Sequence, residues 1–169
     1  MDKTKLTLRQ ITLFGMLGAL TFGAKVCMAW LPNIEPVSLF VMLFAAVFGW
    51  KCFYPIYTYV LMEILYYGIG LWNFNYLYIW AILALAAIAM KKAQKPILWA
   101  ILSGFFGLSF GFLCSPVYVA VGGWGYAFTA WLSGLSFDYA HAIGNFTIAL
   151  VLFVPLRNLL QKLYSKIEH

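Results

Sequence analysis

Residues 8–31 read LRQITLFGMLGALTFGAKVCMAWL. After Arg9, this run holds a single charged side chain, that of Lys25. A helix that crosses a bilayer needs roughly 20 consecutive, mostly apolar residues. The run therefore predicts a membrane-spanning helix near the start of the chain.

The rest of the sequence repeats this composition. The chain has 169 residues, of which 64% are hydrophobic and only 9% are charged, far from the balance of a soluble domain. The sequence therefore predicts an all-α integral membrane protein, with residues 1–169 forming one membrane domain. We expect six transmembrane helices in one compact bundle, at about 8–31, 37–50, 54–71, 76–90, 97–113 and 137–160.

Basic residues follow an alternating pattern along the chain. They gather near the N-terminus, at Lys51, at residues 91–95 and near the C-terminus, whereas the gaps around Asn33 and Asn73 hold none. Short loops that carry Lys or Arg stay cytoplasmic. The pattern predicts a multi-pass protein with both termini in the cytoplasm. The net charge of +6 then fits anionic lipid at the bilayer surface rather than nucleic acid.

The longest gap without basic residues, 115–136, contains the run GGWGY at 122–126. This stretch is too apolar for a disordered tether. It predicts an outer loop that folds back over the bundle as a lid or re-entrant segment.

Small residues recur every four positions in the first predicted helix, at Gly15, Ala19 and Gly23. Such a stripe lets another helix approach closely within lipid. The partner is either another helix of the same bundle or a second membrane subunit.

Charged side chains are rare inside the predicted helices, and each is a candidate site residue because burying charge in a bilayer is costly. Glu63 falls near the middle of the third helix and Lys25 in the outer half of the first. Two interpretations stay open, namely a structural ion pair between them and contact of one or both with a substrate.

The last predicted helix opens with Asp138, His141 and Asn145, at positions i, i+3 and i+7. This spacing places all three on one helix face. Capping by Asp138 and packing by His141 are the structural interpretations. Three aligned polar groups beside an aromatic segment favour a recognition face.

Aromatic residues cluster at the predicted outer end, where some belong to an interfacial belt. They lie near polar residues in the sequence, which predicts an outward-facing pocket lined by rings and a few polar groups. With the three residues above, the candidate substrate-binding set is Trp30, Asn33, Glu35, Asn75, Trp124, Tyr126, Asp138, His141 and Asn145.

Enzymatic function is not expected. Cys27, Cys52 and Cys114 stand alone in separate segments, and the chain has no nucleotide-binding, zinc-protease or nucleophile-elbow motif. We therefore expect no catalytic residue, no metal site and no cofactor.

Two segments carry a resemblance to a known family. LPNIEPV at 31–37 and FDYAHAIGNF at 137–146 resemble the substrate-binding S components of energy-coupling factor (ECF) vitamin transporters. The resemblance extends over essentially the whole chain, through its length, the six predicted spans and the small residues of the first helix.

The resemblance implies a high-affinity binder of a vitamin or related micronutrient in a prokaryotic cell membrane. Its partners would be a membrane scaffold subunit, which Gly15, Ala19 and Gly23 would contact, and two cytoplasmic ATPases. Candidate substrates are cobalamin, thiamin or pyridoxine precursors, and queuosine-type bases. Two alternatives stay open, namely a small proton-coupled transporter that works through Glu63 and a structural membrane subunit.

Overall fold

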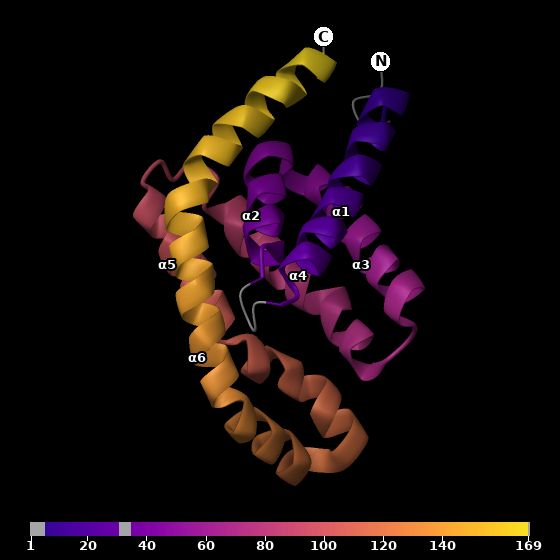
Figure 1. The fold of residues 1–169 in the computed structure, drawn as a ribbon, viewed down its shortest axis with the longest axis vertical. Helices are drawn as coiled ribbons and strands as arrows, with labels where there is room; N and C mark the ends of the chain where they lie inside the picture. The colour runs from indigo at the N-terminus through magenta and orange to yellow at the C-terminus, as the bar shows by residue number, and fades with distance from the viewer. Residues whose placement is uncertain (1–5, 31–34, 169) are drawn as a thin grey trace.

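The chain folds into α-helices and one short 3-10 helix in a computed structural model that describes residues 6–30 and 35–168 (Figure 1). No strand occurs in these ranges. The elements are α1 (Leu8–Met28), α2 (Val37–Phe48), η1 (Gly49–Cys52), α3 (Phe53–Tyr67), α4 (Leu71–Ala89), α5 (Pro96–Leu108) and α6 (Phe110–Glu168). The predicted all-helical class is confirmed.

Four helical stretches of the described chain are long and apolar enough to cross a membrane. The stretches are Leu8–Met28, Val37–Tyr67, Leu71–Ala89 and Pro96–Ile167. The second joins α2, η1 and α3, and the fourth joins α5 and most of α6. These helices are compatible with a membrane location, while six crossings and cytoplasmic termini remain predictions.

Helix α2 forms the centre of the core. It packs against α1, α3, α4 and α6, and most of its side chains are buried, including Met42 and Phe44. Its 12 residues span only about 18 Å at 1.5 Å per residue. The chain leaves α2 at Gly49, whose φ of 58° is a conformation that glycine adopts without steric cost.

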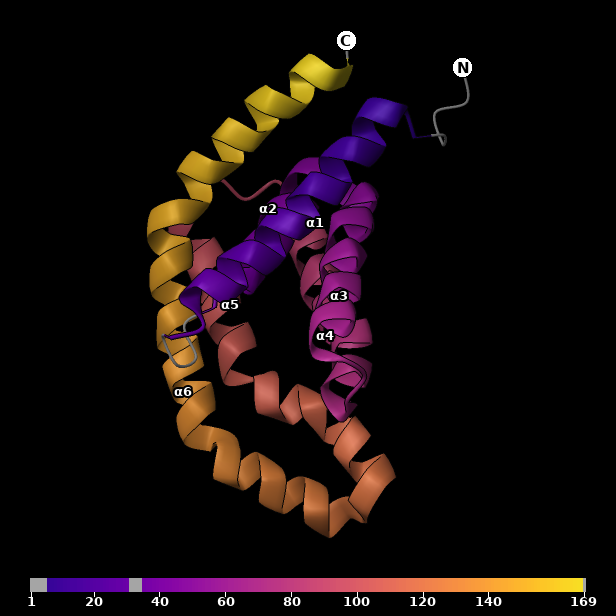
Figure 2. The ribbon, with the colours of Figure 1, turned by 45° about the vertical axis from the view of Figure 1, so that its right-hand side comes forward.

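The beginning of α1 and the end of α6 lie at the same end of the molecule (Figures 1 and 2). Thr7 and Gln10 cap α1 reciprocally, because each side chain accepts the backbone N–H of the other residue at 3.2 Å. The Gln10 amide also donates to the Tyr164 hydroxyl of α6 at 3.1 Å. This contact joins the first and last helices.

Residues 115–136, expected as an outer loop, are helical and belong to α6. Helical geometry breaks at Gly123, where φ is 78° and ψ is 179°. Without water, an apolar segment must satisfy its backbone groups internally, and a helix does so. The Gly-rich composition interrupts the helix without producing a loop. The first part of α6 and its continuation form a turn beyond the ends of the other helices (Figure 2), and the lid-like role of this segment stays a prediction.

Several helix boundaries also differ from the sequence-based estimates. Helix α4 begins at Leu71 rather than near residue 76, because the Asn73 side chain accepts the Gly70 backbone N–H at 2.5 Å and caps the helix. Helix α5 ends at Leu108, and α6 starts again at Phe110. The early restart brings the beginning of α6 close to its own later residues.

Candidate functional site

The α6 face that carries Asp138 and His141 lies directly against α5. A Cβ atom added to Gly107 of α5 would lie 2.9 Å from the backbone of His141. That distance is too short for any larger residue unless the helices move apart. Close packing of α5 on α6 therefore fixes the height and rotation of the polar face.

Asp138 also holds the start of α6. Its two carboxylate oxygens accept the Gly111 backbone N–H at 3.1 and 3.2 Å. Gly111 lies in the first turn of α6, where N–H groups have no partner within the helix. A Cβ on Gly111 would lie 2.5 Å from the Asp138 carboxylate, so the contact requires glycine.

Beside this contact lies a cavity of about 220 Å³. Residues of α4, both parts of α6 and the segment that precedes α2 line it. The side chains that define its chemistry are two carboxylates, one imidazole and five aromatic rings, from Glu35, Asp138, His141, Tyr76, Phe110, Tyr118, Trp131 and Phe137. Segments that lie far apart in the sequence therefore line one cavity that is large enough for a small molecule.

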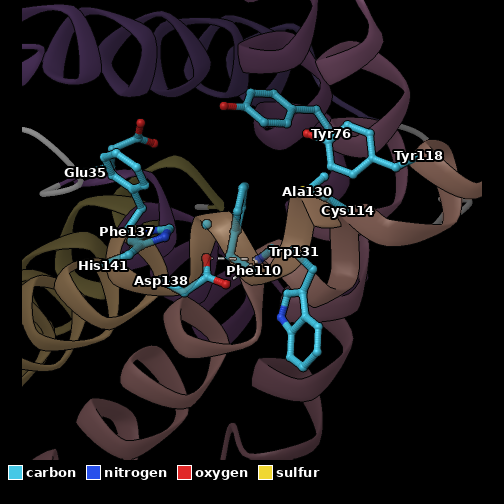
Figure 3. Close-up of a pocket in the computed structure, with 12 residues that line it drawn as sticks. Glu35, Tyr76, Phe110, Cys114, Tyr118, Ala130, Trp131, Phe137, Asp138 and His141 are labelled. Atoms are coloured by element: carbon cyan, nitrogen blue, oxygen red, sulfur yellow. Dashed lines mark hydrogen bonds between the residues drawn. The ribbon is translucent and has the colours of Figure 1, made fainter. Parts of the chain in front are cut away.

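Figure 3 shows the arrangement of these side chains. Glu35 and Tyr76 lie in the upper part of the view, Asp138 and His141 lie below them, and the Phe110 ring stands beside Asp138 and His141. The His141 ring meets Phe110 edge to face at a centroid distance of 5.1 Å. His141 is only 7% exposed, and its Nε2 has no hydrogen-bond partner among the described residues. Because buried polar atoms are normally paired, this nitrogen is available to a ligand.

Of the described residues that line the cavity, Glu35 alone lies outside the four helical stretches that are long and apolar enough to cross a membrane. Burial raises the pKa of its carboxyl above the ordinary value, the charge of Lys25 opposes the shift, and the charge of Glu63 adds to it. Its charge is therefore sensitive to what occupies the cavity.

Lys25 and Glu63 form an ion pair next to this cavity. The Lys25 Nζ lies 2.8 Å from Glu63 Oε2 and donates to the Tyr76 hydroxyl at 3.3 Å. It also lies 5.3 Å from the centroid of the Tyr76 ring. Glu63 is 1% exposed, and its Oε1 has no partner within the described ranges. Tyr76 lines both the cavity and a second, more open hollow that Lys25 and Glu63 border, so one ring separates the two spaces.

Two predicted site residues are buried away from the cavity lining. The Asn145 amide donates to the Ser38 hydroxyl at 3.0 Å and to the Ser103 carbonyl at 3.4 Å, which connects α6 to α2 and α5. Asn75 accepts from the Tyr78 hydroxyl at 3.0 Å. Both amides make contacts that stabilise the fold.

The remaining predicted site residues lie elsewhere or are not described. Trp30 and Trp124 are exposed, and Trp124 lines a separate apolar groove. Tyr126 packs edge to face on Tyr118 at 5.9 Å. Asn33 lies outside the described residues. Of the substrate-binding set, the structure therefore brings together Glu35, Asp138 and His141.

Several residues that position or line the site were absent from the sequence-based set of substrate-binding residues. Tyr76 and Phe110 carry no motif, and many aromatic residues of the chain look equivalent in sequence. Gly104, Gly107 and Gly111 recur at helical spacing, and this pattern in the sequence could have indicated close helix packing here. It marks the α5 face and the start of α6 that approach the later part of α6 most closely.

The glycines of α1 lie on two faces, because Gly18 stands beside the stripe of Gly15, Ala19 and Gly23 rather than in it. Gly15 and Gly23 have open space where a side chain would begin. By contrast, a Cβ on Gly18 would lie 2.6 Å from the Thr58 side chain of α3. Gly18 therefore serves internal packing, while Gly15 and Gly23 leave their face uncovered.

No group of His, Cys, Asp and Glu side chains with metal-binding geometry occurs in the part of the chain that the structure describes. Comparison with protein-family models, with curated proteins and with solved structures finds no match to this chain. The functional interpretation therefore depends on the chemistry of the cavity and on the resemblance of the two sequence segments.

Proposed function

We propose that this chain is the substrate-capture (S) subunit of an ECF-type importer in a prokaryotic cell membrane. In this role it binds a vitamin or related micronutrient and performs no chemistry on it. The observation that carries the proposal is the cavity at Asp138 and His141. Both residues belong to the FDYAHAIGNF segment. The aromatic lining suits a small polar ring compound, as does the His141 Nε2, which has no partner within the described ranges.

The open face of α1 supports the partner part of the proposal. An S subunit delivers its substrate through a membrane scaffold subunit and two cytoplasmic ATPases. A flat helix face suits close packing against another membrane helix, and Gly15 and Gly23 leave such a face free.

Reconstitution in liposomes tests the proposal. We expect purified protein to retain a small molecule that mass spectrometry detects, but not to concentrate that molecule inside liposomes without the scaffold and ATPases. Concentrative uptake by the chain alone would contradict the proposal. The proposal would also be contradicted if the purified protein retained no small molecule and bound none of those added to it.

A proton-coupled carrier is the second candidate, and the observation that favours it is that Oε1 of buried Glu63 has no hydrogen-bond partner among the described residues. In that case a proton gradient alone would drive uptake, and Glu63→Gln would abolish it. The ion pair with Lys25 favours the capture function, because the Lys25 ammonium already holds the Glu63 carboxylate at 2.8 Å.

A further inference from the structure

The acidic side chains of this protein are concentrated at one place. The sequence contains five Asp and Glu residues, and two of them, Asp2 and Glu168, lie at the ends of the chain. The other three are Glu35 and Asp138, which line the cavity, and Glu63, which lies behind Tyr76. A chain with so few carboxylates therefore places most of them around one small space.

Glu63 is paired with Lys25, but the two carboxylates of the cavity have no Lys or Arg beside them among the described lining residues. Lys25, whose charge also acts on Glu35, is held by Glu63 at 2.8 Å. Glu35 and Asp138 thus face the cavity without a basic partner in its lining. Burying charge without a counter-charge is costly. A positively charged ligand would remove that cost.

The aromatic lining favours the same ligand charge. Tyr76, Phe110 and Trp131 border the cavity, and the face of an aromatic ring attracts a cation. A cation–π interaction already occurs beside the cavity, since the Lys25 Nζ lies over the Tyr76 ring, 5.3 Å from its centroid. Rings also stack on flat molecules, which favours a planar ligand over an aliphatic amine.

Two further features restrict the ligand. The cavity volume of about 220 Å³ lies below the range of roughly 300–1,000 Å³ typical of drug-sized ligands, so the volume suits one or two rings rather than a macrocycle. The buried His141 Nε2 offers one directional hydrogen bond that no described residue takes.

We infer that the cavity binds a small, flat organic cation, namely a heteroaromatic ring with a quaternary or protonated nitrogen. Glu35 and Asp138 supply the counter-charge, the rings stack on the ligand, and His141 orients it. The inference rests on the proposed function, because it names the substrate class of the capture site.

Three probes of similar shape and different charge test it at neutral pH. The first is 1-methylquinolinium, which is a permanent cation. The second is quinoline, which is neutral, and the third is 2-naphthoate, which is an anion. Calorimetric titration of the full chain in lipid nanodiscs measures their affinities. We expect the cation to bind at least about tenfold more tightly than quinoline, and 2-naphthoate to bind most weakly.

Variants link this preference to the two carboxylates. Glu35→Gln and Asp138→Asn should each reduce the preference for the cation at least about fivefold. Asn keeps an oxygen that accepts the Gly111 N–H, so the fold contact survives in the second variant. Glu168→Gln removes a carboxylate at the other end of α6 and should leave the preference unchanged.

Equal binding of cation and quinoline, or tighter binding of 2-naphthoate, would overturn the inference. The molecule released by acid from purified protein gives an independent reading. Retention of that molecule on a cation exchanger supports the inference, whereas an anionic or neutral molecule overturns it and leaves the capture function intact. If no molecule is released and no probe binds, both the inference and the proposed function fail.

Discussion

The Lys25 ammonium of α1 and the Glu63 carboxylate of α3 lie 2.8 Å apart, and Glu63 is almost completely buried. The pair joins the last turn of α1 to α3, beside the wall of the candidate site. A charge in such a position is stable only with its partner, because desolvation otherwise outweighs every other contribution.

Removing one partner of this pair should destabilise the protein. We expect Glu63→Gln to lower the free energy of unfolding by about 3–5 kcal/mol, because it leaves the Lys25 ammonium without its carboxylate. Thermal unfolding in detergent measures the change. The double variant Lys25→Met/Glu63→Leu should recover much of the loss. A single variant as stable as the wild type would show that the pair contributes nothing to the fold.

Asp138 and Asn145 should separate binding from folding. Asp138→Asn removes a cavity carboxylate, keeps an oxygen that accepts the Gly111 N–H, and should weaken binding of the co-purified molecule by at least ~1 kcal/mol. Asn145→Ala removes the contacts to Ser38 and Ser103 and should lower the free energy of unfolding by about 1–3 kcal/mol. Parallel calorimetry and thermal unfolding distinguish the two effects. If Asn145→Ala weakened binding without loss of stability, the assignment of Asn145 to the fold would be wrong.

The glycines of α1 should differ in what they affect. Gly18→Leu should destabilise the protein, since even a Cβ there would collide with Thr58. Gly15→Leu and Gly23→Leu point into open space and should leave stability and ligand affinity unchanged while they abolish ATP-driven uptake in cells. Uptake and thermal unfolding of the three variants test this directly. Normal uptake in Gly15→Leu and Gly23→Leu would show that this face of α1 does not dock onto a scaffold subunit.

Glu35 should make the stability of the ligand-free protein depend on pH. Its raised pKa means that the folded state binds the proton more tightly than the unfolded state, whose carboxyl titrates near 4.5. The stabilising contribution is therefore complete below pH 4.5 and is lost as pH rises through the folded-state value. Thermal unfolding over a pH series should show this decline in the wild type and a flatter profile in Glu35→Gln. An identical profile in both proteins would mean that Glu35 titrates normally.

The positions of apolar and polar residues along the chain were enough to predict an all-helical protein with membrane-spanning stretches. The helical part of that prediction is confirmed, and four described stretches are long and apolar enough to cross a membrane, because the requirement is local. Each helix needs a sufficient run of apolar residues and internally bonded backbone, and both are properties of one segment, such as residues 8–28. The i, i+3 spacing of Asp138 and His141 likewise fixes their common face before any other helix is considered.

Tertiary packing decided which of these residues share a cavity. Asp138, His141 and Asn145 lie on the same helix face, but Asn145 is held by α2 and α5, whereas Asp138 and His141 border open space with Glu35 and Tyr76. The split arises because α2 and α5 cover Asn145 with hydrogen-bond partners, whereas α4 and the segment before α2 leave a cavity beside Asp138 and His141. The same dependence on neighbours separates Gly18 from Gly15 and Gly23, since the direction in which α3 packs cannot be read from the small residues themselves.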